Sequence, residues 1–148
     1  MDQFAWFGGG HTVQMAHHLE APFTIDNWVT TGDASPESQP QLDGGPPMGS
    51  AKADKVYSGG LEAVAVVHLL TTQGDRGAGY VAQERIVGSL AGEAGTFVLQ
   101  HGATAGPAGA DPHQWAVVVP GSGTGALVGL SGSGHVDHGL LTLDYDLS

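Results

Sequence analysis

Apolar and polar residues alternate along most of the chain after residue 22, with a period of two. In residues 23–30, Phe23, Ile25 and Val29 alternate with more polar neighbours such as Thr24 and Asp26. This period is typical of a β-strand. Similar segments, rich in Val, Thr, Tyr and Phe and separated by Gly and Pro, follow at residues 51–57, 61–72, 79–90, 95–104, 113–119, 127–135 and 140–147.

These segments predict an all-β protein with little helix, because no long stretch shows the 3.6-residue period of a capped helix. About eight antiparallel strands close naturally into one small β-barrel, which removes the exposed edges of the sheet. The alternative is an open sandwich of two sheets.

The length of 148 residues predicts a single domain. Residues 1–21 show neither period, so we expect an N-terminal arm there and the β-barrel domain in residues 22–148. The start of the chain lacks the positive charge and apolar stretch of a signal peptide, and the longest apolar run, Ala63–Val67, is too short to cross a membrane. We therefore expect a cytoplasmic protein.

The amino-acid composition limits the kinds of molecule that the protein can bind. The chain has 4 Lys and Arg against 15 Asp and Glu, a net charge of −11, and no Cys. This balance predicts no binding to nucleic acid or to an anionic membrane, since both would repel the chain. The absence of Cys excludes disulfides, thiolate nucleophiles and cysteine-based metal sites.

The hairpin formed by residues 79–90 and 95–104 yields the main candidate site. If its loop is centred on Gly92 and Glu93, then Ile86 lies opposite Leu99 and Glu84 lies opposite His101. Because this face is the more apolar one, Glu84 and His101 are expected to point inward as a pair. A carboxylate beside an imidazole can perform acid–base chemistry near neutral pH. The alternative is an internal polar clamp that fixes the strand register.

Other motifs predict no cofactor and no metal. The glycine-rich residues 121–125 follow a strand but precede neither a Lys nor a helix, unlike a phosphate-binding loop. On a strand, His135 and Asp137 share one face while His138 points away from it. His68 lies between apolar neighbours and is interpreted as a core or wall histidine rather than a metal ligand.

Bulky side chains on several strands can either fill the barrel or line a cavity for a small guest. The candidate ligand-binding residues are Trp28, Tyr57, His68, Tyr80, Leu99 and Trp115.

Four ordered blocks carry a resemblance to a known family: Ser58–Glu62, Tyr80–Gly88, Gly95–His101 and Val119–Gly132, followed by Leu143–Tyr145. Over residues 22–148 the chain resembles a family of small bacterial proteins of unknown function. The barrel of that family is similar to the calycin-like barrel of plant allene oxide cyclases. Leu61 departs from the pattern, which more usually has an acidic residue there.

We therefore expect a barrel that holds a small, largely apolar organic molecule, with Glu84 and His101 as polar anchor and catalytic pair. The resemblance implies a cofactor-free cyclase or isomerase, and a homo-oligomer joined through the barrel walls. The alternatives are a non-catalytic carrier or sensor with the same cavity, and a structural protein whose core is filled.

Overall fold

The computed structural model describes residues 16–33 and 45–148, which form eight antiparallel strands in a closed barrel. Each strand pairs with the next along the chain, and β1 also pairs with β8. The strands are β1 (His17–Asp33), β2 (Met48–Tyr57), β3 (Leu61–Gly74), β4 (Gly77–Leu90), β5 (Glu93–Ala105), β6 (His113–Val118), β7 (Leu130–Asp137) and β8 (Leu140–Leu147). Within the described residues, two short 3-10 helices, η2 (Pro107–Gly109) and η3 (Gly125–Leu127), lie in the connections. The all-β barrel predicted from the sequence is confirmed.

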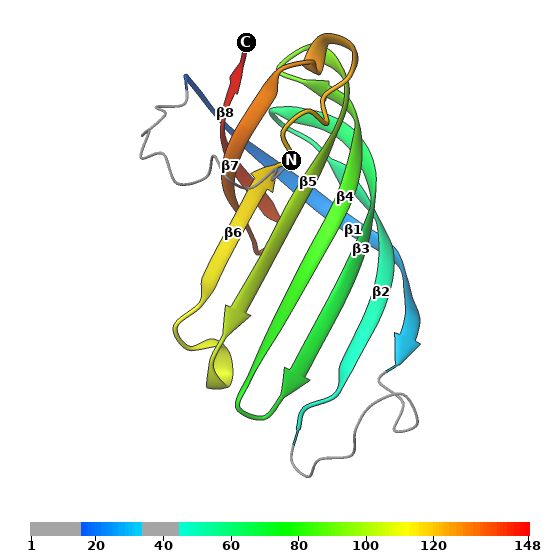
Figure 1. Ribbon diagram of the computed structural model, residues 1–148, viewed down its shortest axis with the longest axis vertical. Coiled ribbons are helices and arrows are strands. Elements are labelled where there is room, and N and C mark those ends of the chain that lie inside the picture. Colours follow the sequence, from blue (N-terminus) through cyan, green and yellow to red (C-terminus); the bar gives the residue numbers. More distant parts are fainter. Residues whose placement is uncertain (1–15, 34–44) are drawn as a thin grey trace, which may run out of the picture.

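Within the described residues the two ends of the barrel differ, and we call them the closed end and the open end. Strands β2 to β6 run side by side as a wall, while β1 crosses behind them (Figure 1). At the upper end in this view, β7 and β8 complete the ring. Strands β3, β4 and β5 have 13 or 14 residues and β7 and β8 only 8, so the wall extends beyond them at the lower end (Figure 1).

The closed end is filled by side chains. Residues that alternate along each strand point inward, as the pleat of a β-strand requires. The largest fully buried apolar side chains of this main core are Phe97, Leu61, Ile86, Leu90, Leu99, Leu127, Leu141, Leu143 and Val118. Val67 lies in a second, smaller cluster with Ala53 and Ala82. Among the described residues, no helix is long and apolar enough to cross a membrane.

Strand β1 begins earlier than we expected. Its first residues, from His17 to Pro22, pair with Tyr145 to Leu140 of β8, although the sequence predicted an arm up to residue 21. The first part of β1 was missed because residues 17–22 have only two buried side chains, Leu19 and Ala21, and therefore show no regular period. The rest of the predicted arm, residues 1–15, lies outside the described residues.

The loop between β4 and β5 is shifted by one residue from its predicted position. The two loop residues are Ala91 and Gly92, with φ of 48° and 87°, rather than Gly92 and Glu93. A two-residue loop of this kind needs a positive φ at both positions, so glycine takes the second one. As a result Glu84 pairs with Leu99, and His101 pairs with Ala82. The predicted pairing of Glu84 with His101 is wrong by two residues, a shift that leaves each side chain on its predicted face.

We expect Ala91→Asn to stabilise the protein, because asparagine tolerates the left-handed conformation that alanine adopts here at a cost. The free energy of unfolding measured by urea denaturation should rise by about 0.5–1 kcal/mol. The matched control is Ala94→Asn in the adjoining strand β5, which should give no gain because asparagine is disfavoured in strands. A loss of stability in Ala91→Asn would contradict this account of the loop.

Candidate functional site

Three charged or titratable side chains meet inside the barrel, where the closed end gives way to the open end. Lys55 of β2, Glu84 of β4 and His101 of β5 are only 2%, 1% and 2% exposed. Each occupies an inward position of its strand, between small or apolar inward neighbours such as Ala53 and Tyr57 on β2. Burial of this kind is rare for charged groups unless they are paired.

The Glu84 carboxylate is the centre of the cluster. Its Oε2 accepts hydrogen bonds from Lys55 Nζ at 2.9 Å and from His101 Nε2 at 2.8 Å, and its Oε1 accepts one from the Tyr57 hydroxyl. Lys55 Nζ also lies 4.0 Å from the centre of the Phe23 ring, a cation–π contact. Within the described residues, every buried polar side-chain atom has a hydrogen-bond partner.

Small residues on β3 allow this cluster to form across three strands. Lys55 and Tyr57 must reach over β3 to meet Glu84 on β4. The inward residues of β3 that pair with them are Ala65 and Ala63. Because neither alanine extends past its Cβ, the two longer side chains can pass above them. His101 reaches Glu84 diagonally from β5, a distance that long side chains span readily.

The donors around Glu84 keep its carboxyl ionised. Burial alone would raise its pKa, but the His101 and Tyr57 hydrogen bonds and the Lys55 ammonium outweigh burial, and the net pKa lies below its ordinary value. Burial lowers the pKa of Lys55 in spite of the opposing effect of Glu84. Burial and the Glu84 charge together raise the pKa of Tyr57, whose hydroxyl therefore remains a donor.

Tyr80 connects this cluster to the open end. Its hydroxyl lies 3.1 Å from His101 Nδ1, and its side chain is only partly buried. Since a carboxylate can only accept, His101 Nε2 donates to Glu84, and in a neutral imidazole the Nδ1 atom would then accept from the Tyr80 hydroxyl. Burial, followed by the charges of Glu84 and Asp137, raises the pKa of Tyr80. The result is a carboxylate–imidazole–hydroxyl chain from Glu84 through His101 to Tyr80.

A hollow of about 320 Å³ lies beyond Tyr80 at the open end. By strand alternation, the side chains that line it from the inner face are those of Thr71, Gln73, Ala78, Tyr80, Ala103 and Ala105. Apart from Gln73 and Tyr80 these side chains are short, which leaves the inner face of the wall open. A volume of this size suits a small organic molecule.

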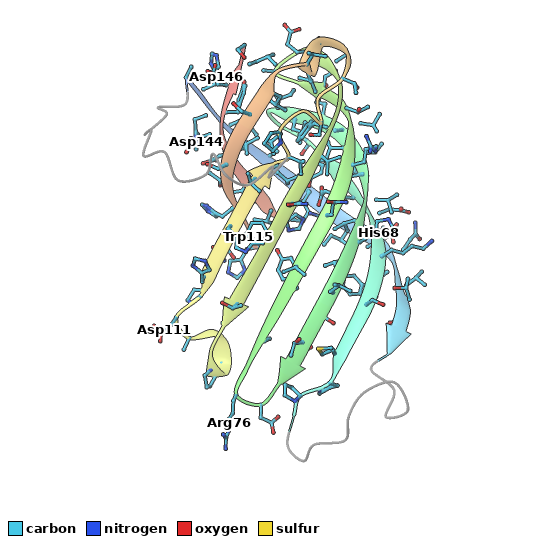
Figure 2. The ribbon with its side chains drawn as sticks, viewed as in Figure 1. His68, Arg76, Asp111, Trp115, Asp144 and Asp146 are labelled. Carbon is cyan, nitrogen blue, oxygen red and sulfur yellow. The ribbon has the colours of Figure 1, made fainter. Side chains whose placement is uncertain are left out.

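The structure separates the predicted ligand-binding residues into two groups. Tyr57, Tyr80 and Leu99 point inward: Tyr57 and Tyr80 join the polar cluster, and Leu99 is a fully buried core residue. Trp28, His68 and Trp115 are exposed. Figure 2 shows His68 and Trp115 towards opposite flanks of the wall. His68 was interpreted as a core or wall histidine, and the core alternative is wrong. The residue is exposed on the outer face of β3, as are its apolar neighbours Val66 and Leu70.

Sequence analysis missed Lys55. Its charge and its position next to Val56 concealed it, because the more polar residue of a pair is normally the exposed one. The available signal was the series Ala51, Ala53 and Tyr57, which shares the parity of Lys55 on β2.

Among the described residues, no group of three His, Asp or Glu side chains is placed to hold a metal ion.

Comparison with known proteins identifies the family. Residues 19–147 match the family described as "Protein of unknown function (DUF3224)". The chain belongs to this family. A crystal structure of a DUF3224 protein of unknown function from Shewanella oneidensis MR-1 shares 29% sequence identity, with a TM-score of 0.71 over 89% of this chain and 97% of that one. No curated protein matches the chain.

We expect Glu84→Gln to destabilise the protein strongly, because it leaves the Lys55 ammonium buried without a counter-charge. Breaking a buried ion pair in this way costs about 3–5 kcal/mol. Urea denaturation at neutral pH provides the measurement. Lys55→Met in the Glu84→Gln background should recover part of the loss, and Glu62→Gln on the outer face of β3 is the matched control that should have little effect.

The effect should depend on pH. Since the folded pKa of Glu84 lies below its ordinary value of 4.5, the unfolded chain binds the proton first as the pH falls. The stabilisation by the carboxylate is therefore present above pH 4.5 and is lost as the pH falls through the folded pKa, so wild type and Glu84→Gln should converge in acid. A constant difference at all pH values would contradict the ionised state.

Proposed function

We propose that this DUF3224 protein binds a small, largely apolar organic molecule in the open end of its barrel, and acts on it as a cofactor-free isomerase or cyclase. The observation that supports this proposal is the hydrogen-bonded chain Glu84–His101–Tyr80, whose last member lies at the hollow of about 320 Å³. A ligand in the hollow would contact Tyr80 directly.

The energetic cost of the cluster favours a functional role over a structural one. Several kcal/mol are lost when a charged group is moved from water into the interior, and apolar residues of similar volume are often as stable or more stable. The closed end of this barrel is built from such apolar residues. Groups whose pKa values are shifted by burial and a specific charge partner are concentrated at functional sites.

The chain of groups is suited to moving a proton. A ligand C–H or O–H hydrogen would pass to the Tyr80 oxygen while the Tyr80 proton passes to His101 Nδ1. The Glu84 carboxylate would stabilise the imidazolium that forms, as the carboxylate of a catalytic triad does. Returning the proton to a different atom of the ligand completes an isomerisation without any cofactor. In this scheme Tyr80 is the catalytic residue, and His101 and Glu84 act through it.

The filled closed end limits where a ligand can bind. Phe97, Leu99 and Leu143 occupy that part of the interior, so the guest is confined to the open end. The same hollow supports a carrier or sensor, which would bind the molecule without moving a proton. The proposal retains the likeness to allene oxide cyclases and the cytoplasmic location, both expected from the sequence.

We expect Ala103→Trp to prevent binding of Nile red, a neutral apolar dye, because an indole at this inward position fills the hollow. Fluorescence titration should show saturable binding to the wild-type protein and at least a roughly tenfold weaker affinity for the variant, about 1.4 kcal/mol. The matched control is Gln100→Trp, on the outer face of the same strand β5 and away from the hollow, which should bind like wild type. Equal binding by all three proteins would refute a site in the open end. Native mass spectrometry of the purified protein would identify a molecule already bound there.

We expect Tyr80→Phe to abolish proton transfer but not dye binding, since only the hydroxyl is lost. The probe is exchange of the α-hydrogens of cyclohexanone in D₂O, followed by NMR. Wild type should accelerate this exchange, and the variant should lose about 10²-fold or more of the acceleration. Tyr145→Phe, the same change at a buried tyrosine of β8, is the control. Exchange that is unaffected in Tyr80→Phe, or absent in wild type, would leave the carrier as the surviving function.

A further inference from the structure

The outer wall of β2, β3 and β4 carries an unusual number of apolar side chains. Their exposed fractions lie between 44% and 61%; the residues are Val56, Val64, Val66, Leu70, Val81 and Val87. Four of them, Val56, Val64, Val66 and Val87, line a hollow of about 680 Å³ on the outer surface, which also contacts Asp54, His68, Gln83 and Arg85. An exposed cluster of apolar side chains edged by polar ones, such as these four valines, typically marks an interface.

Strand pairing arranges this wall in four rows centred on β3. The outermost rows are Val56–Val64–Val87 and Ser50–Leu70–Val81. Between them lie the rows Asp54–Val66–Arg85 and Lys52–His68–Gln83. In the Asp54–Val66–Arg85 row, an acidic residue and a basic residue therefore stand at equal distances on either side of Val66.

The charges on this wall have few partners within the chain. Among the described residues, no carboxylate lies within ion-pair distance of the Arg85 guanidinium. Asp54 accepts one hydrogen bond, from Asn27 at 2.8 Å through Oδ2. The wall holds Lys52 and Arg85, two of the four basic residues of a chain whose net charge is −11. It is thus a face on which two copies can approach with little mutual repulsion.

We propose that this wall binds a second copy of the chain, related by a two-fold axis parallel to β3. Such an axis places β3 against β3, and β2 of each copy against β4 of the other. Val56 then meets Val87 of the second copy, and Asp54 meets Arg85 of the second copy, so that two ion pairs flank the valines. A two-fold axis across the strands would instead oppose Asp54 with Lys52 and leave Arg85 without a carboxylate. The surface is self-complementary, as a two-fold interface requires.

Charge exchange tests this arrangement. Sedimentation equilibrium over the micromolar range should show a monomer–dimer equilibrium for wild type. Arg85→Asp places two carboxylates together at both symmetric positions, and should raise the dimer Kd by about 100-fold or more. Asp54→Arg should weaken the dimer similarly. The double variant Asp54→Arg with Arg85→Asp should restore it, because the ion pairs are then reversed.

The matched control is Arg76→Asp, the same charge change in the exposed β3–β4 turn, which should dimerise like wild type. Circular dichroism checks that each variant is folded. A monomeric wild type, an assembly larger than a dimer, an unaffected Arg85→Asp dimer, or a folded double variant that remains monomeric would each overturn the proposal. None of these results depends on the ligand or the reaction proposed above.

Discussion

The burial of the Glu84 carboxylate constrains the rest of this structure. A lone carboxylate in the interior would be severely destabilising, so its donors must be in place whenever the barrel is closed. Those donors come from two other strands, Lys55 and Tyr57 from β2 and His101 from β5. A slip of one residue in any intervening pairing would turn one of them to the outer face. The cluster thus specifies the register of four consecutive strands, which the small and repetitive side chains of β3 define only weakly.

The same cluster explains why the middle of the wall reverses the usual distribution of residues. Lys55 and Tyr57 need space above β3, and alanines at positions 63 and 65 provide it. The apolar residues that give β3 its strand propensity, Val64 and Val66, consequently face outward. Their exposure leaves an apolar patch on the outer surface whose contact with water is unfavourable. The buried charges and the exposed valines are therefore two consequences of the same alternation of side chains along β2 and β3. A partner bound to the outer wall would bury the valines that the interior cluster leaves exposed.

The barrel architecture could be predicted from the sequence, but the side-chain contacts inside the barrel could not. Alternation and turn residues were sufficient for an all-β barrel of eight strands, because both signals are local. Glu84 and His101 were assigned to the inner face in spite of the wrong loop, since an error of two residues preserves parity. Lys55 and His68 were misjudged for one common reason: apolar neighbours were assumed to mark the buried face, whereas on β2 and β3 they mark the outer one. Which face of a strand lines the barrel interior depends on the tertiary structure, and the hydrophobicity of the strand alone does not determine it.

The position of the Glu84 cluster within the barrel is a stronger argument for a functional role than the types of residue in it. A polar clamp needed only for register would be equally effective among the leucines of the closed end, far from solvent. Here the chain of hydrogen bonds instead ends at Tyr80, the first partly exposed member, where the long strands β3, β4 and β5 extend past β7 and β8. Charges deep in the barrel are thereby connected to its mouth through a single hydroxyl whose pKa remains high. This arrangement holds the Tyr80 hydroxyl against the hollow and shields the carboxylate behind it, which fits the proposed transfer of a ligand proton to Tyr80 as the Tyr80 proton passes to His101.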